Sequence, residues 1–164
     1  MDGAARLERR FSDWVSWENR NSLAGADQPG VYVTARSDRS IAGEPFSWRE
    51  EIIYVGMTNA PYGLKGRLGH FDATISGKAH NHGGGERVRH KFPVYQSLWP
   101  QLYVAVVPFA CDVKSNKPKD LIVMGKVAEF EYVTFAQFAE EFGGLPEFND
   151  KKRSPKPPRT TCTT

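Results

Sequence analysis

The sequence lacks the features that mark several protein classes. It contains no run of eighteen apolar residues, so no membrane-spanning helix and no membrane partner are expected. Its only cysteines, Cys111 and Cys162, cannot build a disulfide framework or a cysteine-based zinc site. The N-terminus is charged from Asp2 to Arg10, unlike a secretory signal, which makes the cytoplasm the default location. The net charge of +3 is mildly basic and argues little for nucleic acid by itself.

The length and composition are those of one globular domain. The chain has 164 residues, of which 40% are hydrophobic and 12% aromatic, and no internal repeat is visible. Residues 1–29 are expected to form an N-terminal helical extension and a connector. A helix is predicted there because apolar residues recur at intervals of four, three and three, at Leu7, Phe11, Trp14 and Trp17. We expect both tryptophans to cap the core rather than to stack on bases.

A β-hairpin is predicted next. Two short β-favouring runs, residues 30–35 and 51–57, flank a polar span that contains Gly43 and Pro45. The connecting loop, residues 37–50, is longer than a tight turn requires and carries several arginines. A contact with DNA and a simple solvated excursion both remain open for it.

A helix should follow the hairpin. It is indicated by a capping asparagine, a proline and apolar residues at helical spacing: Asn59, Pro61, Leu64, Leu68 and Phe71. Arg67 and His70, three residues apart, would share one face of this helix. If that face lies over the hairpin, these two side chains and two strand tyrosines, Tyr32 and Tyr54, form a polar cluster.

The segment 76–91 contains three successive glycines and is expected to be a mobile loop. It lacks the glycine spacing and the Ser or Thr of a phosphate-binding P-loop. His80, His82 and His90 invite a metal site, but no carboxylate or cysteine completes one. The favoured interpretation is that segment 76–91 forms a flexible basic flap that closes on phosphates. The nucleic-acid-binding residues expected in this window are Lys65, Lys78, Arg87, Arg89 and Lys91.

The rest of the chain predicts a small α+β domain. Residues 102–107 form the clearest buried strand, and residues 121–142 have a helical pattern that ends at two glycines. The expected fold is a three-stranded antiparallel sheet flanked by helices over residues 30–149. Residues 150–164, with three prolines and no large apolar side chain, are expected to be a disordered basic tail.

The ordered motifs resemble those of the GIY-YIG nuclease superfamily. Gly30-Val31-Tyr32 stands where the first motif belongs and Tyr54-Val55-Gly56 where the second does. Arg67 matches the helical arginine, and Glu129 and Asn149 can fill the two remaining positions. The resemblance spans residues 30–149 and implies a metal-dependent endonuclease that hydrolyses DNA phosphodiester bonds.

Phosphodiester hydrolysis needs an activated water, a cation near the phosphate and help for the leaving oxygen. Arg67 can grip the phosphate, and Glu129 can hold one Mg²⁺ or Mn²⁺ ion, with Glu131 as its competitor for this role. The resemblance implies that Tyr32 is the base or orienter of the attacking water. Tyr54 would then hydrogen-bond in the same cluster, and Asn149 would anchor the site or contact the phosphate.

Two departures from the family pattern leave alternatives open. Relatives often carry His or Tyr four residues after the arginine, where this chain has Phe71. His70, one residue early, is the candidate catalytic residue that takes over this role through a shifted helix; an ordinary surface histidine is the alternative. Met57 replaces a lysine that some relatives carry directly after the second motif. The alternative function is therefore a non-catalytic module that keeps the fold and binds nucleic acid or protein. A homodimer is compatible with the sequence but no interface is indicated.

Overall fold

A computed structural model describes residues 9–158 of the chain, and it contains one antiparallel sheet flanked by helices. The sheet has four strands in the order β1-β4-β2-β3. Their bounds are Val15–Ser16 for β1, Gly30–Arg36 for β2, Ile52–Thr58 for β3 and Leu102–Pro108 for β4. The α+β class, the hairpin of β2 and β3, and the neighbouring strand β4 are confirmed. The predicted count of three strands is wrong, because β1 adds a short fourth strand beside β4.

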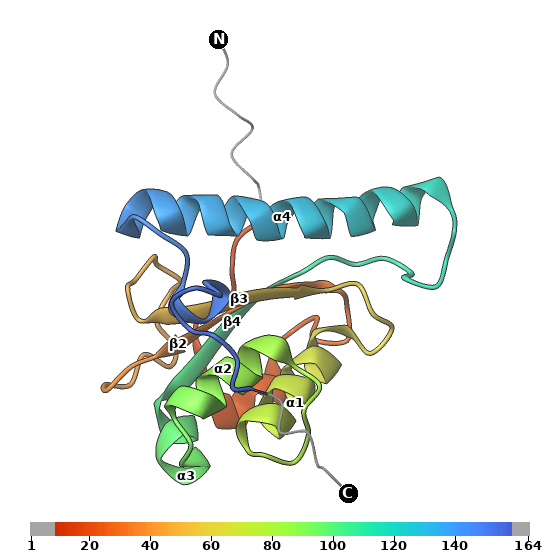
Figure 1. Ribbon diagram of the computed structural model, residues 1–164. Helices are drawn as coiled ribbons and strands as arrows, with labels where there is room; N and C mark the ends of the chain where they lie inside the picture. The colour runs from red at the N-terminus through yellow and green to blue at the C-terminus, as the bar shows by residue number, and fades with distance from the viewer. Residues whose placement is uncertain (1–8, 159–164) are drawn as a thin grey trace, which may run out of the picture.

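The helices lie on both faces of the sheet (Figure 1). They are α1 (Gly63–Ile75), α2 (Gly83–Lys91), α3 (Tyr95–Leu98) and α4 (Pro118–Phe142), with short 3₁₀ helices η1 (Trp17–Ser22), η2 (Trp99–Gln101) and η3 (Glu147–Asn149). Figure 1 shows α4 along one face and α1, α2 and α3 on the other. The expected helices after the hairpin and over residues 121–142 are confirmed. None of the helices in residues 9–158 is long and apolar enough to cross a membrane.

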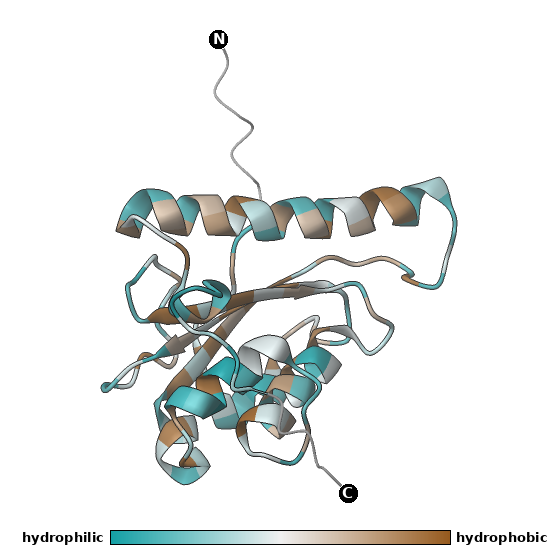
Figure 2. Cartoon of the chain, in the orientation of Figure 1, coloured by the Kyte–Doolittle hydropathy of each residue, from teal (hydrophilic) through white to brown (hydrophobic). Residues whose placement is uncertain are grey.

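Strand β2 is the centre of the core. It pairs with β3 on one side and β4 on the other, and its side chains are buried in clusters on both faces of the sheet. Because side chains alternate along a strand, Val31 and Val33 pack in the cluster beneath α4, while Tyr32 points into the cluster beneath α1. The hydrophobic colour of Figure 2 follows this buried sheet between the two helical layers. A central strand thus carries one tyrosine into the α1 side of the protein.

The predicted N-terminal helix is wrong for the part of it that lies within the described residues. Residues 9–14 have no helical assignment, and the chain then forms β1 and the 3₁₀ helix η1. Trp14 and Trp17 are both fully buried, as expected of core caps, but they enter the clusters on opposite faces of the sheet. One helix face could not deliver both rings, and Leu7 lies outside the described residues.

The predicted mobile loop is also wrong, because residues 83–91 form helix α2. His82 supplies the N-cap, since its Nδ1 accepts a hydrogen bond from the Gly85 N–H at 3.0 Å. Close packing explains a glycine in the first turn: a Cβ on Gly84 would lie 2.2 Å from Cε2 of Tyr54. Glycine destabilises a helix relative to alanine, but only glycine at position 84 leaves room for the Tyr54 ring.

Replacing Gly84 by alanine should destabilise the fold although alanine favours helices. The added methyl must displace the Tyr54 ring, and overpacking of this kind costs about 1–3 kcal/mol. Gly69→Ala in α1 is the matched control, because no atom lies within 4 Å of its Cβ position. That variant should be neutral or up to about 1 kcal/mol more stable. Urea unfolding measures both, and equal stability of the two variants would show that the Tyr54 contact does not constrain α2.

Candidate functional site

The two motif tyrosines lie on the same face of the sheet. Tyr32 is paired with Gly56 across β2 and β3, and Tyr54 precedes Gly56 by two residues, which returns it to the same face. The ring centroids of Tyr32 and Tyr54 are 6.0 Å apart. A Cβ on Gly56 would lie 2.5 Å from the Tyr32 hydroxyl oxygen, so only glycine leaves room for this ring. The second motif therefore has a structural reason for its glycine.

Arg67 projects from α1 toward these tyrosines and is half-buried. Its positive charge lowers the pKa of both phenols. Among residues 9–158, no acid lies within ion-pair distance of its guanidinium, and its buried Nε has no hydrogen-bond partner. A half-buried guanidinium that lies beside the Tyr32 hydroxyl and has no acid partner is suited to an anion, because its charge is partly desolvated and not neutralised.

Both tyrosines are neutral at neutral pH in the free protein. Burial raises the pKa of Tyr32 well above its usual value of 10, and burial also raises the pKa of Tyr54. The nearby Arg67 opposes this increase in pKa but does not outweigh it. The Tyr32 hydroxyl is therefore a hydrogen-bonding group here rather than a preformed base.

His82 belongs to the cluster, although the sequence pointed only to a weak metal role for it. Its buried ring places Nε2 2.7 Å from the hydroxyl oxygen of Tyr32. Because Nδ1 accepts from the Gly85 N–H, the ring proton is on Nε2 and is donated to Tyr32. Burial, assisted by the charge of Arg67, lowers the pKa of His82 to about 3. No standard N-cap signal marks it, because histidine is not a preferred N-cap residue and Glu86 stands one position beyond that of a capping box.

The position four residues after Arg67 is filled by a buried aromatic ring. Phe71 packs against His82 with ring centroids 4.9 Å apart. His70 instead lies beside Tyr62 at the rim, with ring centroids 4.7 Å apart. The imidazole in contact with Tyr32 is thus that of His82, and a catalytic part for His70 stays a prediction.

Glu131, not Glu129, is the carboxylate that faces the cluster. Val127 and Phe130 dock α4 on the sheet, and Glu131 follows Val127 by four residues, so it stays near that docked side. Its negative charge raises the pKa of Tyr32 and Tyr54. Burial raises the pKa of Glu131 itself, with Arg67 opposing. Glu129 is exposed to solvent on another side of the helix.

Glu131 forms no hydrogen bond or ion pair with another residue in the described range. No group of three or more potential metal-ligating side chains occurs in residues 9–158. Within the described part of the chain, Glu131 is thus the one carboxylate whose charge acts on both tyrosines.

Asn149 lies in η3 and holds strand β3 rather than the tyrosines. Its side-chain amide accepts from the Val55 N–H and donates to the Val55 carbonyl, both at 2.8 Å. Val55 directly follows Tyr54, so the amide fixes the backbone beside the second motif. This contact agrees with the anchoring alternative for Asn149, while a phosphate contact stays untested.

The expected nucleic-acid-binding residues lie in different local environments. Arg87 is nearest the cluster, since its charge lowers the pKa of Tyr54. Lys91 is already in an ion pair with Glu147. The side chain of Arg89 lies against Gly77, and Lys65 and Lys78 are exposed. Of these five residues, Arg87 alone is linked electrostatically to the tyrosines.

The C-terminal segment brings an additional cation to the same side of the protein. Residues 151–158, expected to belong to a disordered tail, lie partly against α2, while residues 159–164 are outside the described range. Lys156 pairs with Glu86 at 3.4 Å, and its charge contributes to the lowered pKa of His82. A hollow of about 1210 Å³ is lined by His80, His82, Arg89 and Lys156, among others.

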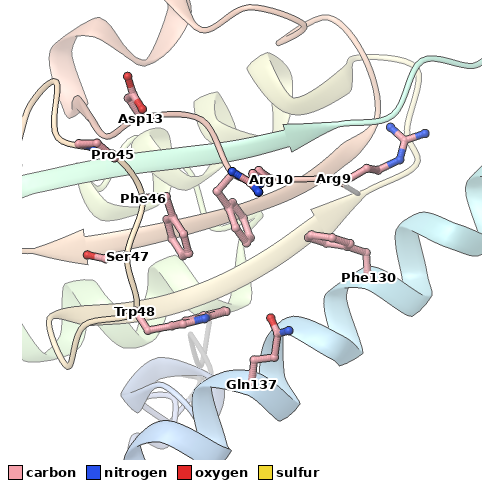
Figure 3. A pocket seen from close by; sticks show the side chains of 10 residues that line it. Arg9, Arg10, Asp13, Pro45, Phe46, Ser47, Trp48, Phe130 and Gln137 are labelled. Carbon is pink, nitrogen blue, oxygen red and sulfur yellow. The ribbon is translucent and has the colours of Figure 1, made fainter. Parts of the chain in front are cut away.

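A second hollow, of about 960 Å³, opens on the α4 side of the sheet (Figure 3). Aromatic rings from the N-terminal segment, the β2–β3 loop and α4 line it, including Phe11, Phe46, Trp48 and Phe130. The rings of Phe11 and Phe46 stack on each other, with 4.5 Å between their centroids. Among the described residues, Asp13 is the only acid in its lining, which also contains Arg9 and Arg10.

No family model, curated protein or solved structure matches the chain. The GIY-YIG resemblance therefore rests on the motif residues, and it remains a prediction.

The buried neutral His82 should make the fold sensitive to acid. Its pKa is about 3 in the folded protein against 6.5 when exposed, so protons bind the unfolded chain preferentially between these values. Its contribution to stability is therefore complete above pH 6.5 and is lost as the pH falls toward 3. The slope of unfolding free energy against pH should approach about 1.4 kcal/mol per unit from this group.

His82→Asn tests this, because asparagine can still cap α2 but cannot titrate. Chemical unfolding from pH 7 to pH 4 should show a shallower slope in this variant. His90→Asn, an exposed position on the same helix, should keep the wild-type slope. An unchanged slope in His82→Asn would contradict the buried, neutral assignment.

Proposed function

We propose that the protein is a metal-dependent endonuclease that hydrolyses DNA phosphodiester bonds through a GIY-YIG-type site. The observation that carries this proposal is a half-buried Arg67 without an acid partner. It lies next to the buried Tyr32, the partly buried Tyr54 and an unpaired Glu131. Structural arginines and glutamates at such depth are normally paired. Two opposite charges that remain unpaired in one cluster suggest an anion and a cation as their partners in the working site.

The anion that fits Arg67 is the scissile phosphate. Its planar guanidinium can give two parallel hydrogen bonds to phosphate oxygens, and its charge counters the negative charge that develops in the transition state. A donor of this kind is worth about 3–4 kcal/mol in comparable sites. Arg87 and Lys156 add positive charge on the same side and are suited to flanking phosphates. Lys65, Lys78, Arg89 and Lys91 remain proposed contacts farther from the tyrosines.

The cation that fits Glu131 is Mg²⁺ or Mn²⁺, one ion per site. A single carboxylate is enough only for a hard ion that keeps several water ligands and takes others from the substrate. When bound, such an ion supplies charge neutralisation and a more acidic water. With one protein ligand, its affinity should be low in the absence of DNA.

Tyr32 is proposed to orient the attacking water. Its oxygen accepts the proton of His82 Nε2 and lies beside the Arg67 guanidinium, which leaves its own proton for a water molecule. His82 thereby fixes the direction of this hydroxyl, and Tyr54 lies beside it. Asn149 is proposed as a positioning residue for Tyr54, because its amide holds the backbone of the adjacent Val55.

Cleavage of supercoiled plasmid tests the proposal. With Mg²⁺ or Mn²⁺ the wild type should nick or cut, and chelator should stop it. Arg67→Ala and Glu131→Gln should each lose about a hundredfold or more in rate, the size expected for removing one transition-state interaction. Glu129→Gln, two residues away on the exposed side of the same helix, should retain wild-type activity.

Each other outcome removes part of the proposal. If Glu129→Gln is inactive and Glu131→Gln is not, the metal ligand is Glu129. If Arg67→Ala cuts as fast as wild type, the site assignment is wrong. Absence of cleavage by the wild type with either ion overturns the enzymatic proposal.

The second candidate function is nucleic-acid binding without turnover. It is favoured by the raised pKa of Tyr32 and by the single carboxylate at the cluster. In that case the wild type should bind DNA with an affinity that falls steeply with salt, in chelator as well as in Mg²⁺, and should never cut it. A nuclease should bind in chelator and cut when the ion is added.

A further inference from the structure

The outer face of α4 carries exposed apolar residues on both sides of Glu129. Large side chains on it are strongly exposed: Tyr132 is 72% exposed, Ile122 59% and Leu121 49%. The small residue Gly125 lies between Ile122 and Tyr132, and the exposed Ala136 follows Tyr132 by one turn. No atom lies within 4 Å of the Cβ position of Gly125. The 25 residues of α4 make a rod about 37 Å long. These five residues are called the α4 outer stripe below.

None of the described elements covers this stripe. The buried side of α4, which includes Val127, Phe130, Thr134 and Phe138, packs on the sheet. Figure 1 shows the opposite side of α4 without another helix or strand over it, and Figure 2 shows a brown turn near its N-terminal end. Exposed apolar surface of this extent on one regular element marks a contact with another molecule.

Charge is distributed unevenly along the same helix. The N-terminal half carries Lys119 and Lys126, after Lys117 at the cap. The last turn carries Glu140 and Glu141, and Glu129 lies near the middle of the helix. None of these residues forms an ion pair with another residue of the described range. The helix is thus basic at one end and acidic at the other, apart from Asp120, which is buried.

We propose that the α4 outer stripe is a two-fold interface with a second copy of this chain, with the two α4 helices antiparallel. Antiparallel pairing sets the basic half of one helix against the acidic half of the other and also opposes the helix dipoles. A parallel arrangement would bring like charges together. The stripe meets itself in such an interface, as two-fold symmetry requires, and Gly125 and Ala136 allow the backbones to approach closely.

The charge pattern also selects this occupant over others. An acidic membrane surface would be repelled by the glutamate half, and a partner of one charge sign would match only half of the helix. The contact is confined to one helix face, which places it at the small end of specific interfaces, so a dissociation constant of roughly micromolar order is expected.

This interface uses none of the proposed active-site residues, so it does not rest on the proposed function. Glu131 is nevertheless on the same helix, on the side toward the tyrosines. The dimer would therefore hold two Arg67–Glu131 clusters at a fixed separation through one rigid pair of helices.

Sedimentation equilibrium of the full chain tests the proposal first. The wild type should self-associate at concentrations up to roughly 1 mM, well above a micromolar dissociation constant. Tyr132→Glu should weaken association by about tenfold or more, as for loss of a central interface aromatic. Val94→Glu, a 59% exposed apolar residue outside α4, should associate like wild type. Thermal unfolding should confirm that both variants fold.

A charge-reversal pair tests the antiparallel arrangement. Lys119→Glu with Lys126→Glu gives an all-acidic helix, and Glu140→Lys with Glu141→Lys gives a predominantly basic one. Each variant alone should associate less than wild type, and the two mixed should form heterodimers that high salt weakens. A monomeric wild type, a Tyr132→Glu variant that associates normally, or variants that do not prefer each other would each overturn the proposal. Binding of vesicles or other proteins by a monomeric wild type would assign the stripe to those partners instead.

Discussion

The hydrogen bond between His82 and Tyr32 joins the centre of the sheet to helix α2, and much of the site depends on it. The same imidazole caps α2 through its other nitrogen, so both ring nitrogens are used and only the neutral tautomer satisfies them. A helix that begins with three glycines has little intrinsic stability. Its position is set by this cap and by the packing of Gly84 on Tyr54.

Close approach is the second constraint, and it explains why glycines surround the tyrosines. A Cβ on Gly30 would lie 2.2 Å from the carbonyl oxygen of Val107, so the first motif begins where two strands meet too closely for a side chain. Gly56 makes room for Tyr32, and Gly84 makes room for Tyr54. The glycines of the cluster thus allow two large rings to be buried side by side without displacing the backbone around them.

The sequence was sufficient for the elements that have strong periodicity. The hairpin, the strand at 102–108 and the long helix α4 follow from alternation and from helical spacing, which report burial directly. It failed where a distant contact decides the local structure. The glycines of segment 83–91 predict a loop. The residues that hold this segment as a helix lie elsewhere: Tyr32 in β2 bonds the cap residue His82, and Tyr54 in β3 packs on Gly84. The spacing of Trp14 and Trp17 is that of one helix face, yet the two rings pack on opposite faces of the sheet.

The sequence predicted which residue types form the candidate site better than it predicted how they are arranged. Tyr32, Tyr54 and Arg67 converge because strand alternation and helix docking bring them together. The choice between Glu129 and Glu131 depended on the rotation of α4 about its axis, which spacing alone does not determine. His82 was missed as a partner of Tyr32 because fifty positions separate them in the chain.

The side chain of Asn149 has a consequence that concerns the sheet rather than the reaction. β3 is a terminal strand, and an open strand edge with free N–H and C=O groups can recruit a strand from another molecule. The amide of Asn149 occupies both groups of Val55 in the middle of that edge, as a foreign strand would. It therefore protects the chain against aggregation at the one sheet edge that borders the tyrosine cluster.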